Sequence, residues 1–345
     1  MNSEFNKRPH RRKNILTGEW ILVSPHRTKR PWQGKEEKPQ HKEAISYDPK
    51  CYLCPGNERA GGGVNPDYKE TYSFKNDYAA ILDGPFESTK DGLLEAETET
   101  GLCKVICYAP DHSLTLPLME DHQILSVVDL WQKEYQELGA MDAINHVQIF
   151  ENKGEIMGCS NPHPHGQIWA QRSIPQEVQK KHKNQEDYWN KNNKSLLKDY
   201  IDLELRKNER IIVENETFVA LIPYWAVWPY ESMIVPKKQH QSILTLSNAE
   251  KKDFGSIIKT LTIKYDNLFG VSFPYSAGIH QAPTNSMSNE FWHFHMSFYP
   301  PLLRSAEVKK FMVGYEMFAT PQRDITAEQA AEKLKSCSEI HYSKA

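Results

Sequence analysis

The chain has 345 residues, which is long enough for one large domain or two of ordinary size. Its 42 basic and 45 acidic residues nearly cancel, and no apolar run reaches the length of a membrane span, so we expect neither nucleic acid nor a membrane as a partner. Six scattered cysteines do not make the framework of a small disulfide-rich domain, and we expect a cytoplasmic protein.

The N-terminal part pairs an expected strand with a basic loop. The apolar run Trp20–Val23 indicates a strand, and Arg27 and Arg30 follow it in a loop bounded by Pro31 and Gly34. The guanidinium fork of arginine suits a diphosphate. An exposed basic loop would explain the same residues.

A Cys-x-x-Cys pair lies in a turn-rich segment at Cys51 and Cys54. It is compatible with a redox pair, with half of a zinc site, or with no chemistry. The chain has no second such pair, so a four-cysteine zinc site is excluded and further ligands would have to be histidines, for which His112 and His163 are candidates. A Cys2His2 set would suit structural zinc.

A helix and a strand are expected before the richest segment of the chain. Ser126–Asp129 has the pattern of a capping box and predicts a helix from there to about Ala143. The alternating run Val147–Phe150 predicts a strand.

The segment from Gly158 to Gln167 is the most informative one. In an extended backbone, alternate side chains share a face, so we expect His163, His165 and Gln167 to lie side by side. Gly158 and Gly166 would let a ligand approach the backbone closely. A neutral imidazole can attack phosphorus and form a covalent intermediate, although histidine pairs also bind metals.

The second half repeats this order of elements. Residues 176–195 predict a solvated helix or a mobile connection, and a capping box at Ser247–Glu250 predicts a helix. A strand around Ser276–His280 and a second His-x-His, at His293 and His295, follow. The parallel between the halves indicates an internal duplication. A last helix is expected from the box at Thr326.

Together these segments resemble the galactose-1-phosphate uridylyltransferase family, a divergent branch of the histidine-triad superfamily. The similarity spans nearly the whole chain, and its most specific part is Gln167, which stands where hydrolytic members of the superfamily have a third histidine. The other segments that carry it are 11–20, 23–27, 150–154, 158–167, 265–269, 299–306 and 310–317.

The resemblance implies an α+β fold with a twisted antiparallel sheet, or half-barrel, flanked by helices and built from two pseudo-repeats. We divide the chain into an N-terminal half, 1–195, with the catalytic and zinc residues, and a C-terminal half, 196–345, with the hexose-phosphate segment. Members of the family are typically homodimers with both active sites near the subunit interface.

The reaction implied is a two-step exchange. His165 attacks the α-phosphorus of UDP-glucose, releasing glucose 1-phosphate, and galactose 1-phosphate then takes the uridylyl group to give UDP-galactose. Gln167 would hold a phosphoryl oxygen without acting as an acid, which favours transfer over hydrolysis.

The substrate contacts implied by the resemblance fall into three sets. The phosphate set is Arg27, Arg30, Asn152, Gly158, Cys159, Ser160 and Gln167. The uridine set is Leu53, Phe74, Asn76 and Asp77. The hexose set is Lys310, Val313, Tyr315, Glu316 and Gln322. Without the resemblance, a surface ion pair is the simpler interpretation of Lys310 and Glu316.

The metals implied by the resemblance are one zinc ion and, in some relatives, a second ion, usually iron. The zinc ligands match Cys51, Cys54, His112 and His163. At the second site His280 and His295 match, but Lys181 and Ser297 stand at the other two positions. We therefore expect that site to be absent, or rebuilt with His182 or His293.

Two other functions compete with this assignment. One is a related nucleotidyltransferase or phosphorylase with another nucleotide donor, such as an adenylyl sugar. The other is a zinc-dependent nucleotide- or RNA-binding module without turnover, against which the balanced charge argues.

Overall fold

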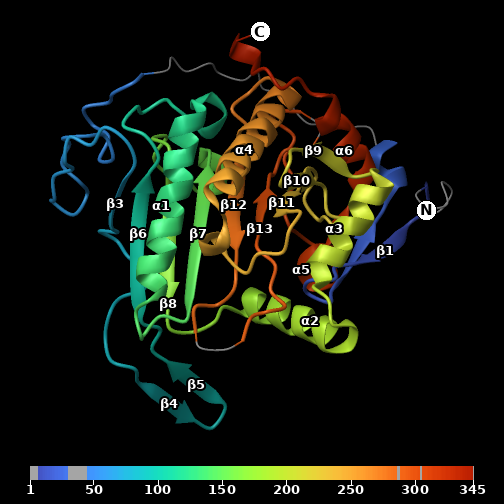
Figure 1. The fold of residues 1–345 in the computed structure, drawn as a ribbon, viewed down its shortest axis with the longest axis horizontal. Helices are drawn as coiled ribbons and strands as arrows, with labels where there is room; N and C mark the ends of the chain where they lie inside the picture. Colours follow the sequence, from blue (N-terminus) through green and yellow to red (C-terminus); the bar gives the residue numbers. More distant parts are fainter. Residues whose placement is uncertain (1–6, 30–44, 286–287, 304, 345) are drawn as a thin grey trace.

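The computed structural model describes residues 7–29, 45–285, 288–303 and 305–344. Its centre is a nine-stranded sheet in the order β3-β6-β8-β7-β12-β13-β11-β10-β9, and every described pairing within it is antiparallel (Figure 1). The strands are β3 (Tyr72–Lys75), β6 (Gly101–Cys107), β7 (His146–Lys153), β8 (His165–Gln171), β9 (Ile211–Glu214), β10 (Phe218–Leu221), β11 (Ser232–Pro236), β12 (Tyr275–His280) and β13 (His295–Tyr299).

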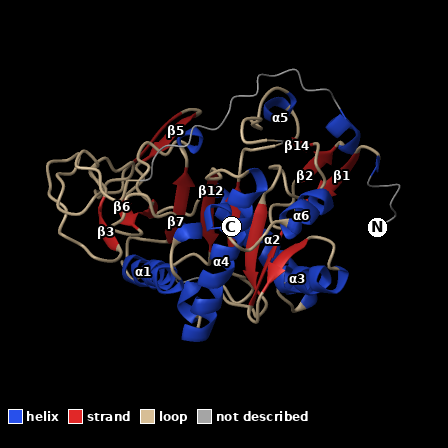
Figure 2. Cartoon of the chain, turned by 90° about the horizontal axis from the view of Figure 1, so that it is seen from above, coloured by secondary structure: helices blue, strands red, loops and turns tan. Residues whose placement is uncertain are grey.

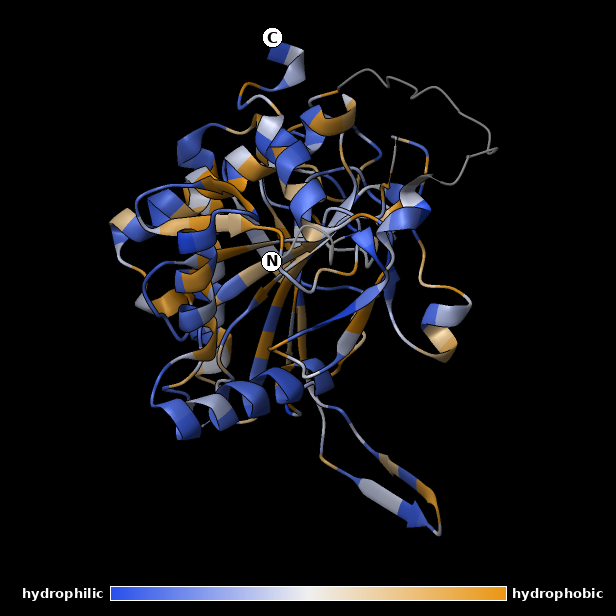
Figure 3. Cartoon of the chain, turned by 90° about the vertical axis from the view of Figure 1, so that its right-hand side faces the viewer, coloured by the Kyte–Doolittle hydropathy of each residue, from blue (hydrophilic) through white to orange (hydrophobic). Residues whose placement is uncertain are grey.

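The remaining elements surround this sheet. A small sheet holds β1 (His10–Lys13), β2 (Trp20–Val23) and β14 (Gln322–Arg323), and the hairpin of β4 (Ser88–Asp91) and β5 (Leu94–Glu97) projects from the body (Figures 1 and 3). The helices are α1 (Asp121–Gly139), α2 (Gln176–Asn192), α3 (Leu196–Lys207), α4 (Asn248–Phe269), α5 (Tyr315–Phe318) and α6 (Ala327–Ser336). Short 3-10 turns lie at Pro25–Lys29, Leu116–Leu118, Glu155–Met157, Ile243–Thr245 and Tyr342–Lys344. No helix among the described residues is long and apolar enough to cross a membrane.

The order of the strands shows the internal duplication. Read towards the centre, the sheet runs β3-β6-β8-β7 from one edge. From the other edge it runs β10-β11-β13-β12 after the additional edge strand β9, so β7 and β12 pair in the middle. Helix α1 connects β6 to β7, as α4 connects β11 to β12. The expected α+β fold with two pseudo-repeats is confirmed. The boundary at 195/196 stays a prediction.

Two apolar layers sandwich the sheet because side chains alternate along each strand. In β10, Phe218 and Ala220 pack with α1 and α4, whereas Val219 and Leu221 pack with α3. Figure 2 shows the helices distributed over the two faces. The site described below lies on the face opposite α1 and α4, where His165 begins β8.

The predicted first turn was right for two helices and wrong for a third. The Ser247 and Thr326 capping boxes begin α4 and α6 as predicted. Helix α1 instead begins at Asp121 and ends at Gly139, because Glu120 and Gln123 form its capping box. Ser126 lies inside the helix, where its hydroxyl donates to the His122 carbonyl oxygen. Such a bond is a common alternative role for helical serine.

Most of the segment 176–195 forms helix α2, Gln176–Asn192, rather than a mobile connection. Figure 3 shows that the surface of α2 is strongly hydrophilic, as the sequence indicates. The helix is nevertheless anchored, because Lys181 and Gln185 are buried.

Candidate active site and metal centre

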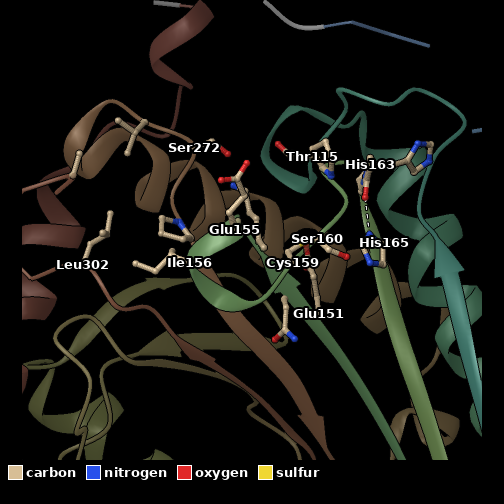
Figure 4. Close-up of a pocket in the computed structure, with 18 of the residues that line it drawn as sticks. Thr115, Glu151, Glu155, Ile156, Cys159, Ser160, His163, His165, Ser272 and Leu302 are labelled. Carbon is tan, nitrogen blue, oxygen red and sulfur yellow. Dashed lines mark hydrogen bonds between the residues drawn. The ribbon is translucent and has the colours of Figure 1, made fainter. Parts of the chain in front are cut away.

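A cavity of about 1020 Å³ opens at the start of β8, beside the turn that joins β7 to β8 (Figure 4). Residues from the loop that contains Leu302 and Lys309 close its other side. Of the predicted site residues, those that line this cavity are Asn152, Cys159, Ser160, His163 and His165.

The His165 ring is held in one tautomer. Its Nδ1 atom lies 2.7 Å from the main-chain oxygen of His163, the bond drawn in Figure 4. A carbonyl oxygen only accepts, so Nδ1 carries the hydrogen and Nε2 keeps its lone pair. Burial holds the pKa of His165 below its usual value, which favours the neutral, nucleophilic ring near neutral pH.

The predicted row of three side chains on one face is wrong in one position. His165 and Gln167 alternate with buried residues along β8, but His163 precedes the strand and its ring is buried, 1% exposed, in a different environment. Pro162 and Pro164 flank His163, and proline lacks the N–H that a ladder requires. The regular alternation therefore starts only at His165.

The expected reason for Gly166 is also wrong. A Cβ at Gly166 would lie 2.4 Å from the Tyr108 hydroxyl oxygen and 3.0 Å from the Phe150 carbonyl oxygen. This glycine therefore permits close packing within the protein, not the approach of a ligand. Gly158, by contrast, has φ +80° at the end of a 3-10 turn, a conformation that favours glycine.

The side chain of His163 belongs to a buried group with Cys51, Cys54 and His112. One ligand atom from each residue lies within 4.8 Å of all the others. The Cys54 sulfur is 3.5 Å from Nδ1 of His112 and 3.6 Å from Nδ1 of His163. Two thiols and two imidazoles at this spacing are a donor set suited to a tetrahedral metal ion. It is the only group of this kind among the described residues.

Two residues that the sequence reasoning missed orient this group. Asn161 accepts a hydrogen bond from the His163 N–H at 2.9 Å, and its side-chain amide donates to the Cys51 sulfur at 3.3 Å. The Tyr68 hydroxyl lies 3.1 Å from Nε2 of His163, which also lies 2.9 Å from the Ala109 carbonyl oxygen. These contacts place the His163 hydrogen on Nε2 and leave Nδ1 for a metal. The position of Asn161, two residues before His163, was the available signal.

The predicted hexose set lines a second cavity, of about 670 Å³. Arg27 lies there too, with its Nε atom 3.1 Å from Asp324, rather than beside His165. Lys310 and Glu316 form an ion pair, and Lys309 lines both cavities. The predicted residues that line this cavity are Arg27, Lys310, Val313, Tyr315, Glu316 and Gln322. Arg30 falls outside the described residues.

The predicted uridine set lines neither cavity. Leu53 is 1% exposed and packs with Phe74 and the cysteines. The Asn76 side chain accepts from the Tyr78 N–H, and the Asp77 carboxylate accepts from the Gly61 N–H. Their contact with uridine stays a prediction.

The sheet of two related halves carries a tautomer-fixed histidine beside a buried Cys2His2 group. Solved structures agree on the fold. A uridylyltransferase matches with a TM-score of 0.74 and 24% identity over 94% of this chain and 97% of that one. A GalT-like protein from Arabidopsis thaliana matches with a TM-score of 0.74 and 22% identity over 96% and 99%.

The chain belongs to the galactose-1-phosphate uridylyltransferase family. The family model of the N-terminal domain of galactose-1-phosphate uridyl transferase matches residues 1–175, and that of the C-terminal domain matches residues 177–345. Galactose-1-phosphate uridylyltransferase of Haemophilus influenzae is 53% identical, with 98% of this chain and 97% of that protein covered. Those of Saccharomyces cerevisiae and Rattus norvegicus are 51% and 47% identical, covering 98% and 96% of this chain and 97% and 89% of theirs.

Proposed function

We propose that the chain transfers UMP from UDP-glucose to galactose 1-phosphate through a uridylyl group on Nε2 of His165. In the first step Nε2 attacks the α-phosphorus, and the bond from that phosphorus to the bridging oxygen breaks as glucose 1-phosphate leaves. In the second step a phosphate oxygen of galactose 1-phosphate attacks, the N–P bond breaks, and UDP-galactose forms. The observation that carries the proposal is the Nδ1 contact with the His163 carbonyl, which leaves Nε2 as the nucleophile.

Two neutral amides are suited to hold the phosphoryl oxygens. The Ser276 hydroxyl donates to Oδ1 of Asn152 at 2.7 Å, and the Trp169 indole N–H donates to Oε1 of Gln167 at 3.4 Å. In each amide the oxygen is thereby oriented towards a protein donor, so the NH2 group is the part that we assign to the substrate. Such donors stabilise developing charge without supplying a proton to water.

We assign zinc to the Cys51, Cys54, His112 and His163 group, because the donor set and its burial suit a structural ion. Bound there, zinc would fix the loop that contains His163, and that loop presents the carbonyl oxygen to His165. The chemistry of transfer stays with His165, Asn152 and Gln167.

We further propose that the protein is a homodimer. We assign the hexose-phosphate contacts to the cavity lined by Lys310 and Glu316. This cavity is separate from the one lined by His165, although Lys309 contributes to both. Light scattering of the purified chain tests the dimer: a mass of about 80 kDa is expected, twice the 39.9 kDa of one chain, and the single-chain mass contradicts it. The cytoplasmic location stays a prediction.

The transfer mechanism is tested by intact-protein mass spectrometry after incubation with UDP-glucose alone. We expect a gain of one UMP, absent in His165→Gly, and discharge of the adduct by galactose 1-phosphate rather than by water. Incubation with ADP-glucose is the control for the alternative nucleotide donor. Release of glucose 1-phosphate without any adduct would contradict the role of His165.

A further inference from the structure

The C-terminal half repeats the hydrogen-bonding arrangement that fixes the tautomer of His165. His295 begins β13 as His165 begins β8, and its Nδ1 lies 3.0 Å from the His293 carbonyl oxygen. Nε2 of His293 lies 3.0 Å from the Pro236 carbonyl oxygen, as Nε2 of His163 lies 2.9 Å from that of Ala109. Nδ1 of His295 therefore carries the hydrogen, and its Nε2 has a lone pair.

In this half the lone pair meets a side chain of the protein itself. The Lys181 amino nitrogen, from α2, lies 3.1 Å from Nε2 of His295. The His280 ring lies beside that of His295, with centroids 4.7 Å apart and planes 23° apart. Lys181 and His295 are buried, 6% and 0% exposed, and His280 is partly buried.

The residues at this place do not fit the second metal ion that some relatives hold. Only His280 and His295 are ordinary ligands there, and the described residues contain no group of three or more such ligands besides the Cys2His2 group. Neither expected substitute forms a ligand group with His280 and His295 in the described part of the chain. His182 packs edge-on against Phe291 at 4.8 Å between ring centroids, and Nε2 of His293 faces the Pro236 carbonyl.

We propose that the Lys181 amino group takes the place of this second ion, so that the C-terminal half is held together without a metal. Lys181 donates a hydrogen to Nε2 of His295, the atom that would otherwise ligate an ion, and thereby ties α2 to β13. Burial lowers the pKa of Lys181, whereas Glu177 and Glu231 raise it. Burial, and after it the charge of Lys181, lowers the pKa of His280 and of His295, which keeps both rings neutral. The hydrogen bond does not depend on the charge state of Lys181, because an amine and an ammonium group both retain an N–H.

The proposal is tested by restoring the missing ligands. The double variant Lys181→Glu with Ser297→His would offer a carboxylate and a third imidazole beside His280 and His295. Ser297 shares a cavity with Lys181 and lies two residues beyond His295 on the same face of β13. After anaerobic loading with iron(II) and zinc, we expect one ion per subunit in the wild type and two in the variant by elemental analysis. Lys183→Glu, an exposed change of the same charge on α2, should keep one.

Three outcomes would overturn the proposal. A wild-type chain that holds two ions per subunit contradicts it, as does a folded double variant that holds only one. If the double variant does not fold, Lys181→Met decides, because it keeps the length of the side chain and removes the donor. We expect its melting temperature to fall by a few degrees and hydrogen exchange in α2 to accelerate, with the metal content still one. A melting temperature and a rate of hydrogen exchange in α2 equal to those of the wild type would contradict a stabilising role for the hydrogen bond from Lys181 to His295. None of these measurements depends on UMP transfer.

Discussion

The main-chain oxygen of His163 lies 2.7 Å from Nδ1 of His165, while the His163 side chain faces the sulfur of Cys54 at 3.6 Å. One residue therefore contacts the proposed nucleophile through its backbone and the metal-binding group through its ring. Disturbing the metal-binding group is expected to reach the catalytic ring without unfolding the sheet.

Asn161→Ala tests this connection. The change removes the acceptor for the His163 N–H and the donor to Cys51, so metal affinity should fall about 10- to 100-fold, as is typical when a partner of a ligand is lost. Uridylylation of His165 should fall in proportion to metal content when the bound metal is removed with increasing amounts of a chelator. The exposed change Asn190→Ala is the control. Full uridylylation of metal-free protein would contradict the connection.

Gln167→Ala should slow both half-reactions by about 100- to 1000-fold, because it removes a donor to a charged phosphoryl oxygen. The measurement is the single-turnover rate of UMP adduct formation and of its discharge by galactose 1-phosphate. Metal content should be unchanged, because Gln167 contacts Trp169 and not the Cys2His2 group. An unchanged rate would remove Gln167 from the phosphate contacts.

Gly166→Ala should destabilise the protein by about 1–3 kcal/mol, the usual cost of overpacking. The new methyl group would collide with the Tyr108 hydroxyl, so adding Tyr108→Phe should recover part of the loss. Recovery should be incomplete because the Phe150 carbonyl is also close. The measurement is the free energy of unfolding of the single and the double variant, obtained by denaturant unfolding. Equal stabilities for the single and double variants would exclude the hydroxyl as the obstacle.

Glu328 gives the protein a pH-dependent stability. Its carboxylate accepts from Arg12 at 2.9 and 3.0 Å and from Arg210 at 2.6 Å, and these partners hold its pKa at about 2 despite burial. A depressed carboxyl pKa contributes stability above about pH 4.5 that is lost as the pH falls towards 2. Glu328→Gln should cost about 3 kcal/mol near neutrality.

The difference between this variant and the wild type should shrink steadily below about pH 4.5, as followed by chemical denaturation at several pH values. Glu332→Gln, an exposed change on the same helix, should show no such trend. A difference that is independent of pH would refute the role of the ion pairs.

Short sequence patterns correctly predicted where a helix begins when the capping contacts lie within a few residues of each other. The Ser247 and Thr326 capping boxes begin helices, because each side chain meets a backbone N–H three residues away. The Ser126 pattern failed because Glu120 caps the same helix earlier. The place of Lys181 could not be predicted from the segment around it, since its partner His295 lies 114 residues further on.

For the candidate site, the sequence supplied the residue types but not their directions. The resemblance placed His163 and His165 in one segment, yet only the prolines on either side of His163 explain why the two rings point to different environments. Arg27 was expected near the phosphates and lies with the hexose set, a consequence of the parallel pairing of β14 with β2.

The pairing of β7 with β12 at the middle of the sheet has a consequence for folding during synthesis. During synthesis β7 emerges long before β12, so an unpaired strand edge stays exposed while more than 120 residues are added. An exposed edge is a template for pairing with another chain. Because the two halves are related, the β7 edge of a nascent or truncated copy resembles the edge that β12 offers. The N-terminal half produced alone should therefore associate with itself, and a chaperone that shields strand edges should raise the yield of the full chain.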